Sequence, residues 1–312
     1  MNSEEIKAIL TVSLLAAFVD GDKHEREREE IKRIAQGLTG DEGLHLPSLY
    51  QDVLMKRVSL SDTARALTSS ESRQLAYEMA VCVCDVDGKH SPAEEQFLNT
   101  LRTELGLDTG AATTFMQTAD ALTEAPLDAG GVTTAAPANA ADDAELDRMI
   151  LNAAILNGAL ELLPESLSTM AIVPLQMKLV YRIGKAKGYE LDRGHVKDFL
   201  ATAGVGLTSQ YLEQAGRKLL GGLLGKLGGG LLRGAGKQAV SSGMSFASTY
   251  ALGHVAKRYY GSGRTLTTQM LRDTYDSIMQ DGQRLKDQYL PDMQNQARTL
   301  DTQKVMALVR GN

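Results

Sequence analysis

Apolar residues recur at helical spacing along most of this chain, and that periodicity constrains the fold more than any other feature. The spacing of three or four residues is clear in two groups near the N-terminus: Ile6, Ile9, Leu10 and Leu14, then Ile31, Ile34 and Leu38. No alternation of apolar and polar residues, the pattern of a half-buried strand, competes with it. We therefore predict an all-α protein.

The first part of the chain matches itself at an offset of 67 residues, which predicts a pseudo-repeat of about that length. Val19-Asp20-Gly21 aligns with Val86-Asp87-Gly88, and Glu27 aligns with Glu94. Each copy is expected to form an apolar helix, an Asp-Gly turn and a second helix with a glutamate in its first turn. In the second copy, Ser91 followed by Pro92 predicts the helix start, because serine caps helices and proline favours the first helical position.

Residues 125–141 combine small side chains with two prolines and no hydrophobic period, a composition typical of a linker. We predict an acidic helical domain over residues 1–124, this linker, a basic glycine-rich helical domain over 142–262 and C-terminal amphipathic helices over 263–312. The first of those C-terminal helices is expected to be long and to be interrupted at Pro291, because proline breaks helical hydrogen bonding.

Charge is distributed unevenly along the 312 residues, which are enough for two domains with their own cores. The formal net charge of −6 combines −10 over residues 1–124, −4 over 125–149 and +8 over 150–312. No acidic residue lies between Glu213 and Asp273, while nine basic residues do: Arg217, Lys218, Lys226, Arg233, Lys237, Lys257, Arg258, Arg264 and Arg272. We expect this stretch to attract polyanions.

The centre of the basic part is rich in glycine and leucine. Five glycines have the small-xxx-small spacing that lets helices approach closely: Gly221, Gly225, Gly229, Gly230 and Gly234. Glycine destabilises a water-exposed helix, so this region needs a packed or lipid-contacting setting. No stretch of about 20 mostly apolar residues is present, and we predict no membrane span. Residues 1–6 are acidic where a secretory signal is positive, so we expect a cytoplasmic protein, held peripherally at the inner membrane.

Two family resemblances follow from these motifs. The turns Asp20-Gly21 and Asp87-Gly88, each followed seven residues after the aspartate by a glutamate, resemble the TerB family of tellurite-resistance proteins over about the first 120 residues. Residues 146–262 resemble the domain of unknown function of YcjF-type bacterial membrane proteins, through Asn152-Ala153-Ala154, Pro174 to Val180, Gly188 to Leu191, the glycine-rich centre and Thr249 to Gly253. The resemblances imply a bacterial origin, a helical fold, divalent-cation binding in the first module and membrane association in the second.

Carboxylates beside the two Asp-Gly turns are candidate ligands for Ca²⁺ or Mg²⁺, which prefer oxygen. The candidate metal residues are Asp20, Asp22 and Glu27 in the first copy and Asp87 and Glu94 in the second. The alternative is that these side chains cap the following helices and complement their dipoles. A divalent cation is the one cofactor that the sequence indicates.

The basic stretch has two competing interpretations. In the first, basic residues contact an anionic membrane surface: Arg217, Lys218, Lys226, Arg233 and Lys237. In the second, the glycine-rich helices pack against protein, within one chain or between subunits, and the basic side chains extend outward. Nucleic acid is not expected as a partner, because few aromatic residues lie among the charges.

No catalytic pattern is present, since the five histidines are scattered and no nucleophile elbow or phosphate loop occurs. We predict a non-enzymatic bacterial protein of the stress response that associates with the inner membrane and self-assembles. Its acidic module is expected to bind divalent cations or a protein partner. The alternative is a soluble homo-oligomeric scaffold whose glycine-rich helices form the subunit interfaces.

Overall fold

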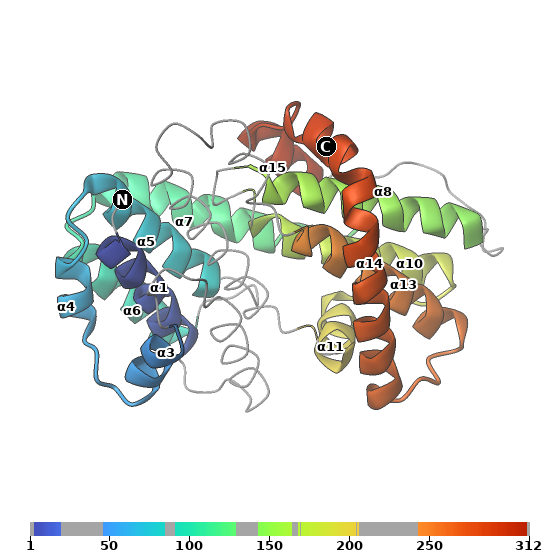
Figure 1. Cartoon of the computed structure of the whole chain (residues 1–312), viewed down its shortest axis with the longest axis horizontal. Coiled ribbons are helices and arrows are strands. Elements are labelled where there is room, and N and C mark those ends of the chain that lie inside the picture. Colours follow the sequence, from blue (N-terminus) through green and yellow to red (C-terminus); the bar gives the residue numbers. More distant parts are fainter. Residues whose placement is uncertain are drawn as a thin grey trace. The chain divides into compact units, whose positions relative to one another are not determined.

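The computed structural model describes residues 3–19, 46–84, 91–128, 143–163, 168, 170–203, 205 and 243–310. Within these ranges the regular structure consists of twelve α-helices and no strand, which confirms the all-α prediction (Figure 1). The chain divides into two compact units, whose described parts lie within residues 3–123 and within residues 124–205 and 243–310. The predicted repeat stays a prediction, because both Asp-Gly turns and the residues of the helix expected after the first one fall outside the described residues.

The first unit is built on two apolar helices, α1 (Ser3–Ala17) and α5 (Ser70–Cys84), which lie against each other. The other described helices of this unit are α3 (Leu46–Leu54), α4 (Leu60–Arg65), α6 (Pro92–Glu104) and α7 (Thr109–Thr123). Helices α3 and α4 contact α1, and α6 and α7 contact α5. Cys82 and Cys84 are buried on α5 and form no disulfide bond, so they act as core residues.

A buried carboxylate joins α1 to the start of α5. Glu5 is 3% exposed, and its Oε1 accepts hydrogen bonds from Thr68 Oγ1 at 3.0 Å, from the Ser69 amide at 3.0 Å and from Ser72 Oγ at 2.9 Å. Negative charge is favourable at a helix N-terminus, where backbone amides lack helical partners. The carboxylate therefore fixes the first turn of α5 against α1.

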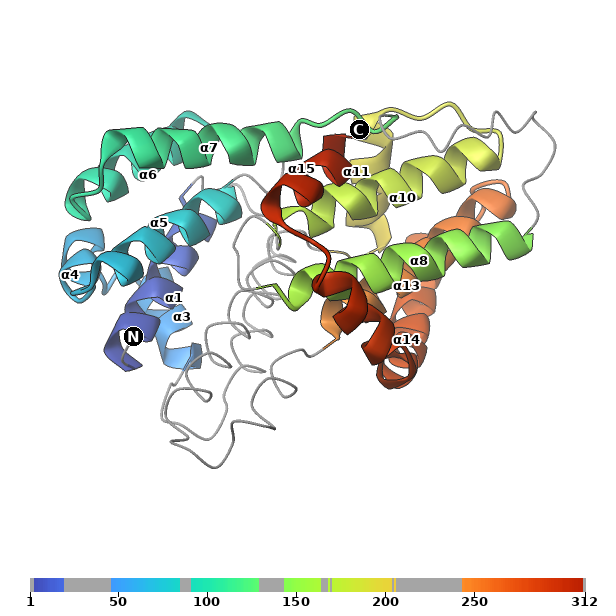
Figure 2. The same ribbon diagram turned by 90° about the horizontal axis from the view of Figure 1, so that it is seen from above.

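The second unit is a bundle around α13 (Met244–Gly261), which contacts α8 (Asp143–Glu161), α10 (Ile172–Ala186) and α14 (Thr268–Ala297). Figure 2 shows α8 and α10 beside each other, with α13 and α14 next to α8. Helix α11 (Arg193–Ala203) contacts α10 and α14, and α15 (Thr302–Arg310) ends the described chain. The start of α13, the long α14 and the short α15 all belong to the same packed unit.

Glycines allow the helices of this bundle to approach closely. A methyl group on Gly253 of α13 would lie 2.7 Å from Ile150 Cγ1 on α8, and one on Gly282 of α14 would lie 2.9 Å from the Ala247 Cα atom on α13. Both distances are too short for real contacts, so no larger residue fits without a shift of the helices. The glycines predicted to have this role lie outside the described residues: Gly221, Gly225, Gly229, Gly230 and Gly234.

Proline does not interrupt α14, and the predicted interruption at Pro291 is wrong. The helix continues through Pro291 to Ala297, although the proline ring removes one backbone hydrogen bond. Met293 lies beyond the proline and is 1% exposed in a cluster with Ala154 and Phe246. Burial of this side chain favours continuation of the helix and offsets the lost hydrogen bond.

None of the described helices has the combination of length and apolar composition that crossing a membrane requires.

Candidate functional site

Of the five predicted metal ligands, only Glu94 lies in the part of the chain that the structure describes; Asp20, Asp22, Glu27 and Asp87 lie outside it. Glu94 is 3% exposed, and its Oε2 accepts a hydrogen bond from the Ser91 amide at 2.8 Å. Ser91 Oγ in turn accepts from the Glu94 amide at 3.3 Å. This reciprocal pair is a capping box, which together with Pro92 confirms the predicted helix start.

The capping role of Glu94 matches the alternative that the sequence left open. Among the residues that the structure describes, no group of three or more histidine, cysteine or acidic side chains is arranged to hold a metal ion. Cation binding by the acidic module therefore stays a prediction, and it depends on the residues near the two Asp-Gly turns.

The predicted basic surface also lies outside the described residues, and its members are Arg217, Lys218, Lys226, Arg233 and Lys237. The structure does describe the two points at which this segment joins the bundle. Val205, just after α11, is 6% exposed, and Gly243 is buried at the start of α13. Residues 206–242, which we call the insertion, therefore lie in the sequence between α11 and α13, two helices of the same packed unit.

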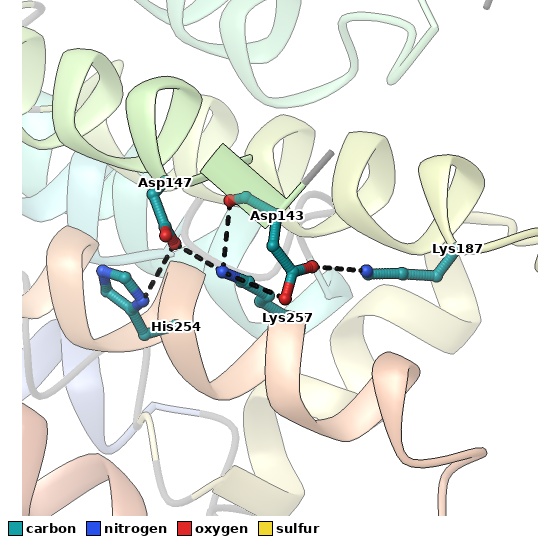
Figure 3. A network of polar contacts seen from close by, with 5 residues as sticks. All are labelled: Asp143, Asp147, Lys187, His254 and Lys257. Atoms are coloured by element: carbon teal, nitrogen blue, oxygen red, sulfur yellow. Dashed lines mark hydrogen bonds and ion pairs between the residues drawn. The ribbon is translucent and has the colours of Figure 1, made fainter. Parts of the chain in front are cut away.

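Five charged or titratable side chains form a network where α8 begins (Figure 3). Lys187 Nζ donates to Asp143 Oδ1 at 2.8 Å. Lys257 Nζ donates to Asp147 Oδ1 at 2.7 Å and to the Asp143 carbonyl oxygen at 3.2 Å, and it lies 3.7 Å from Asp143 Oδ2. His254 Nδ1 is 3.7 Å from Asp147 Oδ1. The network links the start of α8 to Lys187, directly after α10, and to the C-terminal half of α13.

The electrostatics of the network follow from this geometry. The hydrogen bond from Lys187, together with the charges of Lys187 and Lys257, lowers the pKa of Asp143 below its usual value. Burial lowers the pKa of His254, Asp147 opposes that shift and Lys257 reinforces it. His254 is therefore neutral at pH 7, and the two aspartates balance the charges of the two lysines.

A second polar group lies inside the bundle, and we call Asn157, Glu161, Gln176, Ser245, Ser248 and Thr249 the polar seam. Thr249 Oγ1 accepts from Asn157 Nδ2 at 2.9 Å and from Gln176 Nε2 at 3.0 Å. Glu161 Oε2 accepts from the Ser245 amide at 2.7 Å, which caps the start of α13. The seam connects α8, α10 and α13 through side chains that are at most 8% exposed.

The sequence analysis did not single out either group. Their residues come from helices far apart in the chain; Lys257 and Asp147, for instance, are separated by 110 positions. The local signal is the spacing of Asp143 and Asp147, and of His254 and Lys257, which places each pair on one helix face. In both groups, polar side chains of one helix contact other helices of the same bundle.

Residues 2–119 match a family described as "Protein of unknown function (DUF533)". The match covers the first unit's part of the chain and includes the predicted acidic turns. No curated protein and no solved structure matches the chain.

Proposed function

We propose that this protein associates peripherally with an anionic membrane surface and self-assembles there without catalysing a reaction. In this proposal the insertion at residues 206–242, which lies between α11 and α13 in the sequence, contacts the membrane. The observation that carries the proposal is the composition of this insertion: it contains ten glycines, nine leucines, five basic residues and one acidic residue. Leucine favours the acyl boundary and each basic side chain contributes about 1 kcal/mol of attraction to anionic headgroups.

The bundle supports this role because it anchors both ends of the insertion. Helix α11 precedes the insertion and packs on α10 and α14, and α13 follows it and packs on α8, α10 and α14. A segment held at two packed points can bind a surface while the described helices keep their contacts. In the proposal, the acidic first unit binds divalent cations or a basic partner, and the setting is a bacterial stress response of the tellurite-resistance kind.

The test is co-flotation of the full chain with liposomes of increasing anionic lipid content at two salt concentrations. The wild type is expected to float with anionic liposomes at low salt and to lose binding at high salt. Replacing Lys218, Lys226, Arg233 and Lys237 by glutamate should abolish flotation. Interchanging lysine and arginine at the same four positions keeps the charge and should preserve it. Flotation by the glutamate variant at the wild-type level contradicts the proposal.

A soluble homo-oligomeric scaffold is the second candidate, favoured by the close helix contacts at Gly253 and Gly282. They show that this chain uses glycine for packing of protein against protein. If the glycines of the insertion allow close packing between subunits, the protein forms a monodisperse assembly without detergent and does not bind liposomes. Size measurement in solution, with and without liposomes, separates the two candidates.

A further inference from the structure

Aromatic side chains form a cluster at the C-terminal end of α13. The ring centroids of Tyr259 and Tyr260 are 5.3 and 5.7 Å from that of Phe199 on α11, and Tyr189 is 5.3 Å from Tyr260. Four rings therefore meet here, in a chain that has five phenylalanines, ten tyrosines and no tryptophan. Phe199 and Tyr260 are buried, whereas Tyr189 and Tyr259 are partly exposed. The cluster has an inner, packed part and an outer part that reaches the surface.

Arg264 covers this cluster from the turn after α13. Its guanidinium carbon lies 5.4 Å from the centroid of Tyr189 and 6.0 Å from that of Tyr260, the geometry of a cation–π contact. Its backbone has φ of 64°, directly after Gly263 with φ of 73°, and its amide donates to the Tyr259 carbonyl oxygen at 2.9 Å. Glycine adopts this conformation more easily than arginine does, so closing the turn does not by itself require an arginine at this position.

The connection between α13 and α14 is basic and carries an exposed apolar side chain. Arg258 and Arg264 are exposed, and neither forms an ion pair with the residues that the structure describes. Lys257 differs, because Asp143 and Asp147 neutralise it. Met270, in the first turn of α14, is one of the few large apolar residues that the described structure leaves exposed to solvent, with 46% of its surface accessible. We call Tyr189, Arg258, Tyr259, Arg264 and Met270 the α13–α14 tip.

We propose that the α13–α14 tip is a second docking surface for an anionic phospholipid bilayer, separate from the insertion at residues 206–242. The inference rests on the proposed function, since it assumes peripheral membrane association. Arginine guanidinium groups bind headgroup phosphates, tyrosine rings favour the headgroup depth of a bilayer, and an exposed methionine fits the acyl boundary. Charge complementarity selects this occupant, because no acidic residue lies between Glu213 and Asp273 and the exposed carboxylate of Glu190, next to Tyr189, is paired with Lys185.

The test uses the full chain in liposome flotation with two substitutions at the tip, Arg258→Gln and Arg264→Gly. Glycine suits the positive φ at position 264, so the variant loses the guanidinium without straining the turn. Each lost arginine is expected to weaken partitioning onto anionic vesicles about fivefold at low salt. Binding to neutral phosphatidylcholine vesicles should not change. Arg298→Gln is the matched control, because Arg298 is an exposed arginine at the opposite end of α14.

Insertion of the tip can be measured separately from affinity. The chain contains no tryptophan, so Met270→Trp introduces a single fluorescent reporter at the tip. We expect brominated phospholipids to quench this tryptophan in anionic vesicles, and the loss of quenching when Arg258→Gln and Arg264→Gly are added.

The outcomes distinguish the inference from the proposed function. If the tip variant floats like wild type while the glutamate variant of the insertion does not, the inference is wrong and the proposed function stands. If Arg298→Gln reduces flotation as much as Arg258→Gln or Arg264→Gly alone, general surface charge is responsible and the inference is wrong. If wild type does not float with anionic vesicles, both are wrong. If a single-stranded oligonucleotide binds the tip in preference to vesicles, the surface recognises nucleic acid instead.

Discussion

Helix α13 is held by two kinds of polar contact that differ in exposure. Toward the C-terminal end of α13, Lys257 binds two aspartates of α8 whose side chains are 48% and 67% exposed, and His254 lies 3.7 Å from one of them. Nearer the start of α13, Thr249 belongs to the polar seam, where it is fully buried and accepts a hydrogen bond from Asn157 of α8. Water competes for exposed ion pairs, which therefore contribute little, whereas a buried polar group that loses its partner costs its full desolvation energy. The comparison teaches that the buried seam, rather than the more exposed ion pairs, determines how α8 and α13 fit together.

Replacing Glu161 by alanine is expected to give the largest loss, about 3 kcal/mol of unfolding free energy. The Ser245 amide, at the buried start of α13, would lose its carboxylate acceptor. Glu161→Gln keeps an acceptor oxygen and should recover part of the loss. Glu190→Ala, which removes an exposed carboxylate paired with Lys185, is the control and should change little. Urea unfolding checks the order; equal losses for Glu161→Ala and Glu190→Ala would contradict the comparison.

Replacing Gly282 by alanine should cost about 2 kcal/mol, because the new methyl group would lie 2.9 Å from the Ala247 Cα atom. Backbone cannot move aside as a flexible side chain can. Gly261→Ala is the control, since its methyl group would meet nothing closer than 4.0 Å. The control should be neutral or slightly stabilising through its higher helix propensity. Thermal unfolding of both variants measures the difference, and a stabilised Gly282→Ala variant would refute the close contact.

We expect Lys178 to make the stability of the protein depend on pH, with an effect of intermediate size. Its side chain is buried, its Nζ donates to the Val309 carbonyl oxygen of α15, and burial, with Arg182 nearby, lowers its pKa from 10.5 to about 8. Between these two values the unfolded chain binds more protons than the folded one. The contribution of Lys178 to stability therefore rises as the pH increases from about 8 to 10.5.

The measurement for Lys178 is the difference in unfolding free energy between wild type and Lys178→Met, at pH 7 and pH 9.5. The difference should shift in favour of wild type at the higher pH. Burial raises the pKa of Tyr260 to about 12, but the effect of Tyr260 on stability is the same in both proteins and cancels in the difference. Lys185→Met is the control on the same helix. A hydrogen bond to Glu190 raises the pKa of Lys185, so the difference in unfolding free energy between wild type and this variant should be the same at both pH values. A flat difference for Lys178→Met would show that its ammonium is not desolvated.

Replacing Lys257 by methionine should give the smallest effect, a change in melting temperature of about 2 °C or less. The substitution removes the contacts of Lys257 with Asp143 and Asp147, and both carboxylates remain accessible to water. The small difference from wild type should shrink further as salt increases, because salt screens exposed charges. A loss as large as that of Glu161→Ala would contradict the ranking of the buried seam above the exposed ion pairs.

Local patterns in the sequence predicted local structure well. The start of α6 at Ser91 and Pro92 was predictable because its hydrogen bonds join residues three positions apart. The interruption at Pro291 was predicted wrongly because the energy that keeps α14 continuous comes from Met293, which packs on α8 and α13 rather than on its own neighbours in sequence. Pairings between distant helices, such as Asp147 with Lys257, leave too weak a pattern for a single sequence to show.

The sequence by itself determined the all-α fold and the opposite charges of the two halves, since helical spacing and composition are properties of neighbouring residues. Only the tertiary structure decided which glycines are needed for close packing and which polar groups are buried. Gly253 and Gly282 look no different in sequence from other glycines, and each requires its hydrogen side chain because of a partner helix. Burial depends on contacts between residues far apart in the chain, and those contacts exist only once the helices are packed.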